Sequence, residues 1–291
     1  MKIYMNETHD EERAFYGARY AKLINCIFDG PADGESALKE TAGLEIENCD
    51  FLLRYPLWHT EGAVITDCRM TETCRAALWY DNGIIIKNSE LGGIKAVREC
   101  NNVNLEGCSV NSTEFGWFSK KIKMKDCELV SEYPFLRSSE MEFDGLRMKG
   151  KYSFQYTENV TFRNCELDTK DAFWHSKNVT VYDSVVKGEY LAWYSENLRL
   201  VRCKIIGTQP LCYAKGLVIE DCEMIDCDLS FEKSEVTASV KGGITSVKNP
   251  LCGTITADSV GEVIIDDEES RGRIVLRLFW GTRSVSPNPF P

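Results

Sequence analysis

Two carboxylates, Glu99 and Glu114, fall on neighbouring copies of a 19-residue repeat, with Arg98 and Arg137 close by. Glycoside hydrolysis uses a pair of carboxyl groups about 5–5.5 Å or about 6.5–9.5 Å apart, and adjacent or alternate repeats can supply such spacings. Glu99, Glu114 and Arg137 are therefore the candidate catalytic residues, and a glycoside hydrolase or polysaccharide lyase is the enzymatic hypothesis. Solvated surface charges are the competing interpretation, and we favour a protein without catalysis.

Aromatic and charged side chains that could bind a ligand gather in the same part of each repeat. Aromatic rings stack on the C–H faces of sugars while polar groups bond the sugar hydroxyls, so we expect carbohydrate interaction along an aromatic face. A protein interface concentrates the same residue types, which makes a scaffold that forms homo-oligomers through this face the alternative. Stacked rings that only stabilise the fold are a further interpretation. The candidate binding residues are Arg54, Tyr55, Trp58, His59, Tyr80, Arg98, Glu99, Tyr133, Arg137 and His175.

The sequence contains no motif for a metal or a cofactor. No Cys-x-x-Cys pair with matching His residues occurs, as a structural zinc site requires. No dense group of Asp residues stands on the repeats, as a calcium-dependent lyase requires, and the contiguous side chains of Asp266–Glu269 diverge. We therefore expect neither a metal nor a cofactor.

The repeat itself provides the elements that position these residues. A strand pattern returns every 19 residues, apart from one step of 21 residues between Ala63 and Ile84. A fixed period this short predicts a solenoid whose coils stack equivalent positions on one another. The pattern starts at Leu44, Ala63, Ile84, Val103, Ile122, Met141, Val160, Val179, Leu198, Leu217, Val236 and Ile255.

Three short strands and three corners fit into each repeat, which predicts an all-β, single-stranded right-handed parallel β-helix of about twelve coils. One domain is expected over residues 1–291. It has an N-terminal cap at 1–20, with a short helix over 9–20, then coils at 21–265 and a C-terminal cap or tail at 266–291. Corner residues must tolerate left-handed backbone, as Asn, Asp and Gly do. The corner slot holds Asn48, Asp67, Asn88, Gly107, Asp126, Gly145, Asn164, Asp183 and Asp221.

The 13 cysteines would suggest disulfides in a small secreted protein. Most of them occupy one repeat position, which Ser89, Ser184 and Leu146 fill in other coils, so the position requires a small or apolar side chain facing the core. Parallel Cβ vectors are poor for bridging, and we expect reduced thiols, as in a reducing compartment. The cysteines at this position are Cys26, Cys49, Cys68, Cys108, Cys127, Cys165, Cys203 and Cys222.

The aromatic residues belong to the third strand of each repeat, in two adjacent columns. One column begins with Trp58 and the next with His59. Adjacent strand residues point to opposite faces, and the His59 column holds too many ionisable groups to be buried, so we expect it outward and the Trp column mostly inward. The apolar column of Leu57 could also be exposed, and the reversed parity would expose the Trp column instead.

The charge and the hydropathy of the sequence limit the partners that the protein can bind and the cellular compartment expected for it. A net charge of −11 disfavours binding to nucleic acid, which would be repelled overall. No run of about 18 apolar residues occurs, and the first twenty residues, rich in charge, lack the apolar core of a signal peptide. We therefore expect no membrane contact and a cytoplasmic location.

Two segments carry a resemblance to a known family. DGPADGESALKE (Asp29–Glu40) and FLLRYPLWH (Phe51–His59) resemble an uncharacterised bacterial domain-of-unknown-function family, placed among pectin-lyase-like right-handed β-helix proteins. The resemblance spans nearly the whole chain and implies the same fold. It implies no activity, so no catalytic residue follows from it.

Overall fold

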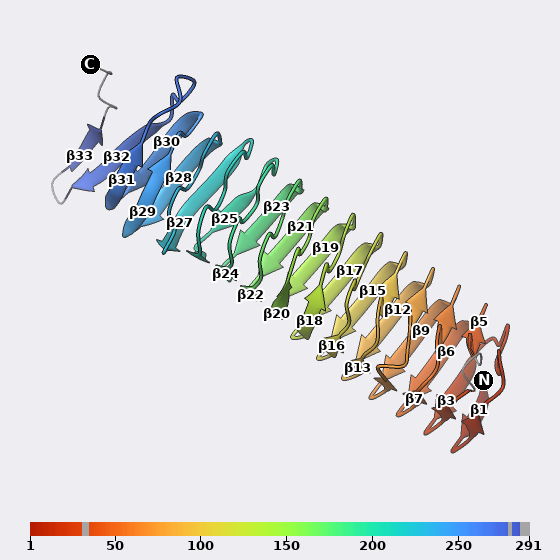
Figure 1. Cartoon of the computed structure of the whole chain (residues 1–291). Coiled ribbons are helices and arrows are strands. Elements are labelled where there is room, and N and C mark those ends of the chain that lie inside the picture. Colours follow the sequence, from red (N-terminus) through yellow and green to blue (C-terminus); the bar gives the residue numbers. More distant parts are fainter. Residues whose placement is uncertain (31–34, 279–280, 286–291) are drawn as a thin grey trace. The chain divides into compact units, whose positions relative to one another are not determined.

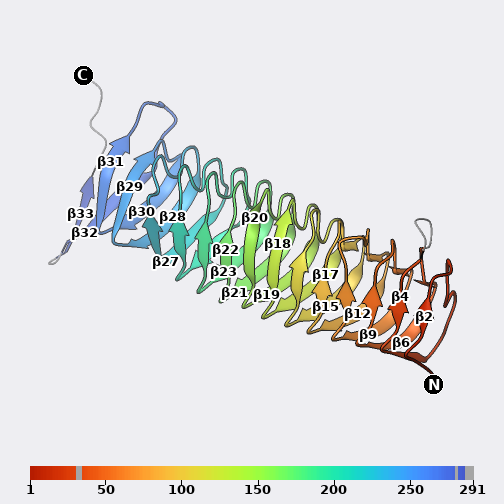
Figure 2. The ribbon, with the colours of Figure 1, turned by 60° about the horizontal axis from the view of Figure 1, so that its bottom comes forward.

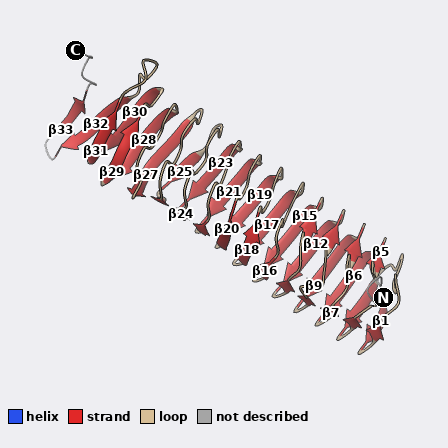
Figure 3. Ribbon diagram, viewed as in Figure 1, coloured by secondary structure: helices blue, strands red, loops and turns tan. Residues whose placement is uncertain are grey.

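Left-handed corner residues separate short strands along the chain, and no described residue is helical (Figure 3). The computed structural model describes residues 1–30, 35–278 and 281–285. Two compact units are present, Met1–Gly150 and Lys151–Pro291. Each unit is built from parallel strands stacked coil upon coil (Figure 1), and the single domain expected over 1–291 stays a prediction.

In the first unit, parallel strands stack on three faces (Figure 2). The first face contains β1 (Lys2–Met5), β3 (Ala21–Ile24), β6 (Ala42–Glu47), β9 (Glu61–Thr66), β12 (Asn82–Lys87), β15 (Asn101–Glu106), β17 (Lys120–Lys125) and β19 (Ser139–Asp144). The second face contains β2 (Thr8–His9), β4 (Ile27–Phe28), β7 (Asp50–Phe51), β10 (Arg69–Met70), β13 (Glu90–Leu91), β16 (Ser109–Asn111), β18 (Glu128–Glu132) and β20 (Arg147–Lys151). The third face contains β5 (Leu38–Lys39), β8 (Leu57–Trp58), β11 (Leu78–Trp79) and β14 (Val97–Arg98).

The second unit keeps the first and second faces and closes with an antiparallel pair. Its first face contains β21 (Glu158–Arg163), β23 (Lys177–Tyr182), β25 (Arg199–Val201), β27 (Leu217–Ile225), β28 (Glu235–Lys241), β30 (Cys252–Ala257) and β32 (Arg273–Leu278). Its second face contains β22 (Glu166–Asp168), β24 (Val185–Lys187) and β26 (Lys204–Ile206), which pairs with the end of β27. β29 (Gly243–Lys248) and β31 (Ser259–Ile264) form a separate sheet, and β33 (Gly281–Val285) runs antiparallel to β32.

The strand register confirms the repeat and the right-handed β-helix. Val103 lies opposite Ile122, 19 residues on, whereas Ala63 lies opposite Ile84, as the step of 21 predicts. The described residues hold about 14 turns, against about twelve expected coils. The additional turns come from segments expected to be caps, because β1 pairs in parallel with β3 and β32 pairs in parallel with β30.

His9 ends β2, residues 10–20 contain turns and a bridge, and the helix expected over 9–20 is wrong. The first coil nevertheless covers the end of the core with aromatic rings. The Phe15 ring lies 4.7 Å from the Tyr4 ring and 4.7 Å from the His9 ring, and the His9 ring stacks 5.5 Å from Phe28. Aromatic packing therefore does here what a helical cap was expected to do.

Small hydrogen-bonding side chains line two inner columns, one at each of two corners. In the thiol column the backbone N–H of Cys49 donates to Cys68 Sγ at 3.3 Å, and the Cys49 thiol donates to the Glu47 carbonyl at 3.3 Å. Ser89 does the same with its hydroxyl, accepting from Cys68 N–H and donating to the Lys87 carbonyl. The expected column of buried, unbridged thiols is thus confirmed, and its role is to complete backbone hydrogen bonding.

The second inner column, the hydroxyl column, lies where the third face turns into the first. Ser119, Ser138 and Ser234 accept an N–H from the preceding coil and donate to a nearby carbonyl, whereas Ser195 Oγ has no partner among the described residues. Ser119 Oγ accepts from Cys100 N–H at 3.1 Å and donates to the Trp117 carbonyl at 3.1 Å. The hydroxyl members include Thr41, Thr60, Ser119, Ser138, Thr157, Ser176 and Ser234.

Asparagine side chains bond one another along a corner of the second unit. Asn178 Nδ2 donates to Asn159 Oδ1 at 3.0 Å, and Asn197 Nδ2 donates to Asn178 Oδ1 at 3.1 Å. All three residues adopt positive φ, and the nine corner residues predicted from the sequence do so as well. Asn serves both needs, because it tolerates left-handed backbone and carries a donor and an acceptor.

Substitution of Gly93 tests how closely the backbones of adjacent coils approach each other. It has φ +78°, and an added Cβ would overlap the Cys74 carbonyl oxygen, whereas at Gly62, φ +66°, nothing lies within 4 Å. Replacement of Gly93 by Ala should cost more than about 3 kcal/mol, because backbone must move. Gly62→Ala should cost about 1–2 kcal/mol from left-handed strain alone. Urea denaturation midpoints compare the two, and equal midpoints would contradict the register.

Substitutions of Asn178 separate the two contributions of a corner asparagine to stability, namely its side-chain hydrogen bonds and its tolerance of left-handed backbone. Asn178→Gly should lose only the ladder hydrogen bonds, about 1 kcal/mol, since glycine accepts left-handed backbone. Asn178→Ala should lose the same bonds and add about 1–2 kcal/mol of backbone strain. The measurement is again the denaturation midpoint, and a glycine variant less stable than the alanine variant would refute this account.

Candidate functional site: the aromatic third face

Two columns of side chains lie on the outer surface of the third face. We call them the Trp column (Lys39, Trp58, Trp79, Arg98 and Trp117 in the first unit; Trp174 and Trp193 in the second) and the outer ladder (His59, Tyr80, Glu99, Phe118 and Arg137 in the first unit; Tyr156, His175, Tyr194 and Tyr213 in the second). Register places Lys39, Trp58 and Trp79 in successive coils of one column. The expectation of a mostly inward Trp column is wrong, because its tryptophans are half-buried.

The reason lies in the backbone of the third face. His59 and Tyr80 have φ of 56°, so the chain turns at these residues instead of alternating as a strand does. Trp58 and His59 therefore share the outer side, and their rings lie 6.1 Å apart. The inward position belongs to the apolar column of Leu57, which is buried. The outer ladder is exposed as expected at His59, Tyr80, Phe118, Arg137 and His175, while Glu99 is half-buried.

Five aromatic side chains form one cluster in the first unit, which we call the Trp58 patch: Tyr55, Trp58, His59, Trp79 and Tyr80. The Trp58 and Trp79 rings stack at 4.9 Å and 14°, and the His59 and Tyr80 rings stack at 5.2 Å and 10°. The Tyr55 ring lies 6.0 Å from Trp58 and 5.4 Å from Trp79. Four expected binding residues thus belong to one contiguous surface.

Cations and carboxylates stand at the two ends of the Trp58 patch. Lys39 Nζ lies 3.6 Å from the centre of the Trp58 ring, a cation–π contact. At the other end Arg98 is opposite Trp79 in the register, and its Nε lies 2.9 Å from Glu99 Oε1. A hydrogen bond to Glu99 raises the pKa of Tyr80 above its ordinary value. The ring stack therefore ends in polar groups.

The candidate catalytic carboxylates have separate cationic partners. Glu99 pairs with Arg98 at 2.9 Å, and Glu114 pairs with Lys95 at 3.2 Å. Arg137 lies further along the outer ladder, next to Leu136, whose carbonyl accepts the N–H of Phe118. Each carboxylate is thus held by the cation of its own coil or of the neighbouring one, an arrangement suited to fixing a surface.

The remaining predicted binding residues lie outside the Trp58 patch or at its margin. Arg54 pairs with Glu35 at 3.6 Å. The Tyr133 carbonyl accepts the indole N–H of Trp117 at 2.5 Å. His175 belongs to the second unit, between the rings of Tyr156 and Tyr194 at 4.9 and 5.0 Å.

The sequence analysis did not include two residues of the third face among the candidate binding residues. Trp79 occupies the same column as Trp58, and the column itself was the available signal. Lys39 precedes Trp58 by one 19-residue step and pairs with it in register, yet it lies in the irregular segment Asp29–Glu40. Column position would have identified both residues.

The indole N–H groups divide the tryptophans into two classes. Those of Trp117, Trp174 and Trp193 each donate to the carbonyl of the residue 16 positions later, at 2.5, 2.7 and 2.8 Å. Those of Trp58 and Trp79 are buried and have no hydrogen-bond partner among the described residues. A buried donor without a partner is rare in native proteins and marks the Trp58 patch.

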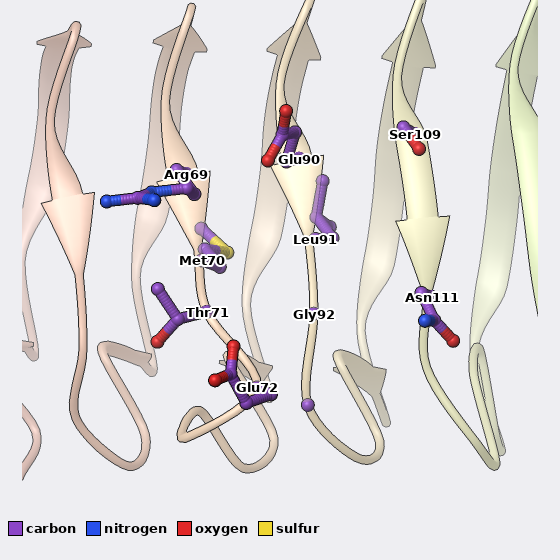
Figure 4. Close-up of a pocket in the computed structure, with 10 residues that line it drawn as sticks. Arg69, Met70, Thr71, Glu72, Glu90, Leu91, Gly92, Ser109 and Asn111 are labelled. Carbon is purple, nitrogen blue, oxygen red and sulfur yellow. The ribbon is translucent and has the colours of Figure 1, made fainter.

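A recess lies on the second face of the first unit (Figure 4). It has a volume of about 290 Å³ and lies beside the extra residues of the 21-residue coil. Its lining includes Glu72, Glu90, Ser109 and Asn111, all exposed. Arg69 also lines the recess, and its side chain bonds Asp50 at 2.9 Å (Figure 4).

Among residues 1–30, 35–278 and 281–285, no three His, Cys, Asp or Glu side chains are placed to hold a metal ion. Nor does this part of the chain contain a helix long and apolar enough to span a membrane.

Several solved structures are similar to this chain at low identity. The surface adhesin PfbA of Streptococcus pneumoniae is 8% identical over 91% of this chain and 86% of its own, with a TM-score of 0.42. DFA-IIIase from Arthrobacter chlorophenolicus A6 without its lid is 8% identical over 94% and 88%, with a TM-score of 0.43. The A-module of mannuronan C-5 epimerase AlgE6 from Azotobacter vinelandii is 9% identical over 91% and 89%, with a TM-score of 0.37. These likenesses carry no functional argument.

A search of curated proteins found no match. The model of one family, described as a protein of unknown function (DUF3737), matches residues 2–275. This match confirms the resemblance seen in the sequence, and the chain belongs to that family.

Proposed function

We propose that the Trp58 patch binds carbohydrate chains without catalysing their breakdown. The observation that carries the proposal is the pair of indole N–H groups, on Trp58 and Trp79, that lack partners within a surface of aromatic rings and polar tips. Sugar sites combine aromatic side chains with a few hydrogen-bonding groups that fix orientation. Both indole N–H groups are buried, so a sugar hydroxyl supplies the missing acceptor only after the surrounding side chains move.

The ring geometry restricts how a sugar would bind. Ring centres 4.9 to 5.2 Å apart leave no room for a ligand between stacked rings. A chain molecule would therefore lie across the ring edges and contact the polar tips, namely the imidazole of His59 and the hydroxyl groups of Tyr55 and Tyr80. Because these tips recur from coil to coil, an extended polymer matches them better than a single compact ligand does.

Ion pairing supports binding over hydrolysis. Glu99 and Glu114 each hold a cation, at 2.9 and 3.2 Å, and these pairs fix the surface around the aromatic rings. A glycosidase needs one carboxyl group as acid and the other as base or nucleophile. The paired carboxylates serve better as hydrogen-bond acceptors for sugar hydroxyls, which is the role we assign to Glu99.

Association of two copies through the third face is the second candidate. The observation that favours it is aromatic exposure: Tyr80, Phe118 and Tyr133 are 41%, 41% and 40% exposed in the first unit. Exposed aromatic residues are enriched in protein interfaces. A solution mass of two chains that Tyr80→Lys reduces to one, with no binding on a glycan array, would replace the carbohydrate proposal with this one.

Loss of the two unpartnered indoles should abolish most of the affinity. Trp58→Ala and Trp79→Ala should each weaken binding of an array-selected polysaccharide at least tenfold, since each removes a central aromatic contact. Calorimetric titration measures the change. Trp117→Ala is the matched control, because its indole already bonds the Tyr133 carbonyl, and it should change affinity less than threefold. Equal losses in all three variants would remove the special role of the Trp58 patch.

Tyr80→Phe distinguishes binding to polar tips from stacking on ring faces. The variant keeps the stack with His59 and loses the hydroxyl, so affinity should fall about threefold to tenfold, the effect of one hydrogen bond. Tyr194→Phe, the equivalent change in the second unit, should leave affinity unchanged. If Tyr80→Phe binds as tightly as the wild type, the hydroxyl takes no part and the edge-on mode is wrong.

A further inference from the structure

Asp81 is the acidic member of the hydroxyl column. It directly follows Trp79 and Tyr80 at the corner between β11 and β12, and it is 1% exposed. Thr60 N–H donates to Asp81 Oδ1 at 2.7 Å, as N–H groups of other coils donate to Ser119 and Ser138. Its other oxygen, Oδ2, is buried and has no partner among the described residues.

Three serines of the column show what a side chain at this position can provide. They both accept and donate: Ser119 accepts from Cys100 N–H and donates to the Trp117 carbonyl. Ser234 likewise accepts from Ala214 N–H and donates to the Leu211 carbonyl. A carboxylate only accepts, whereas a carboxylic acid accepts through one oxygen and donates through the other. Of the two forms of Asp81, only the protonated one has both the acceptor and the donor that these serines have.

The surroundings of Asp81 also disfavour a negative charge. Burial raises its pKa well above the ordinary value, and the hydrogen bonds from backbone N–H groups oppose this only in part. The ionisable groups facing it are Glu61 on the preceding coil and the Cys100 thiol on the following coil. Burial and Asp81 itself raise the pKa of Cys100, and Asn82 Nδ2 bonds Glu61 at 2.9 Å. Neither neighbour supplies a positive charge.

We propose that Asp81 is a neutral carboxylic acid in the native protein, and that its ionisation makes the coil bearing Trp79 and Tyr80 sensitive to pH. The proposal stands independently of carbohydrate binding. Protonation removes the charge from this buried side chain, and loss of the proton leaves a buried carboxylate without a donor for Oδ2. The stability of the Trp58 patch is thereby coupled to the pH.

The direction of the pH effect follows from proton linkage. Between the ordinary pKa of Asp, about 3.9, and the raised native value, the folded protein holds a proton that the unfolded chain has lost. The contribution of Asp81 to stability is therefore complete below about pH 4 and decreases as the pH rises through this window. Within the window, the unfolding equilibrium constant rises about tenfold for each pH unit through this group alone.

Infrared spectroscopy of the full chain detects the acid directly. At about pH 6, two units above the ordinary pKa of Asp, the wild type should show the carbonyl stretch of a protonated carboxyl group, and Asp81→Asn should lack it. Asp171, whose pKa burial also raises, requires its own variant, and Asp171→Asn should keep the Asp81 band. A wild type without any such band at this pH overturns the proposal, whatever the variants do.

Denaturation midpoints as a function of pH provide the second test. Asp81→Ser restores the hydroxyl of the column and should abolish the fall in stability assigned to Asp81. Relative to Asp81→Ser, the folding equilibrium constant of the wild type should fall about tenfold for each pH unit between about pH 4 and 6. Asp67→Asn, at an exposed corner, is the matched control and should follow the wild type. Parallel pH profiles for wild type and Asp81→Ser would refute the proposal.

Discussion

Hydrogen bonding from one coil to the next at the corners is the constraint on which the rest of the structure depends. Strands bond their neighbours automatically once the register is set, but a corner turns the backbone away from its neighbours. This chain meets the constraint with left-handed residues outside and small donor–acceptor side chains inside. Cys49 and Ser89 are interchangeable in this role because thiol and hydroxyl groups both accept an N–H and donate to a carbonyl. The high cysteine content is therefore a consequence of corner geometry.

The same constraint explains which parts of the fold could be predicted from the sequence. First-face strands such as β15 and β17 alternate apolar and polar residues, so both their existence and their inward side follow from the pattern. Corner asparagines, aspartates and glycines are recognisable by type. The third face was harder, since bulky residues such as Tyr55 and His59 adopt left-handed backbone there. No residue-type rule predicts that conformation, and strand parity fails where it occurs.

The candidate site was predicted from column position alone, and this explains both the correct and the missing parts of the prediction. Column position brought Trp58, His59 and Tyr80 together correctly, because equivalent positions stack from coil to coil. It could not show that Glu99 would pair with Arg98, its neighbour in sequence, because adjacent strand residues were assumed to point apart. It also could not show that the Trp58 and Trp79 indoles lack partners. Side-chain pairing depends on local backbone detail that a period of 19 residues does not encode.

One of the irregularities of this protein lies beside the Trp58 patch. The coil between Ala63 and Ile84 contains two extra residues, and it also carries Trp79, Tyr80 and the buried Asp81. A solenoid satisfies its polar groups by repetition, so a departure from the period is where unpaired groups are expected. The tryptophans of regular coils bond a carbonyl 16 residues on, and an altered coil length moves that carbonyl for Trp58. The additional residues thus account physically for the unpartnered indole of Trp58, whereas Trp79 is followed by a regular 19-residue step to Arg98.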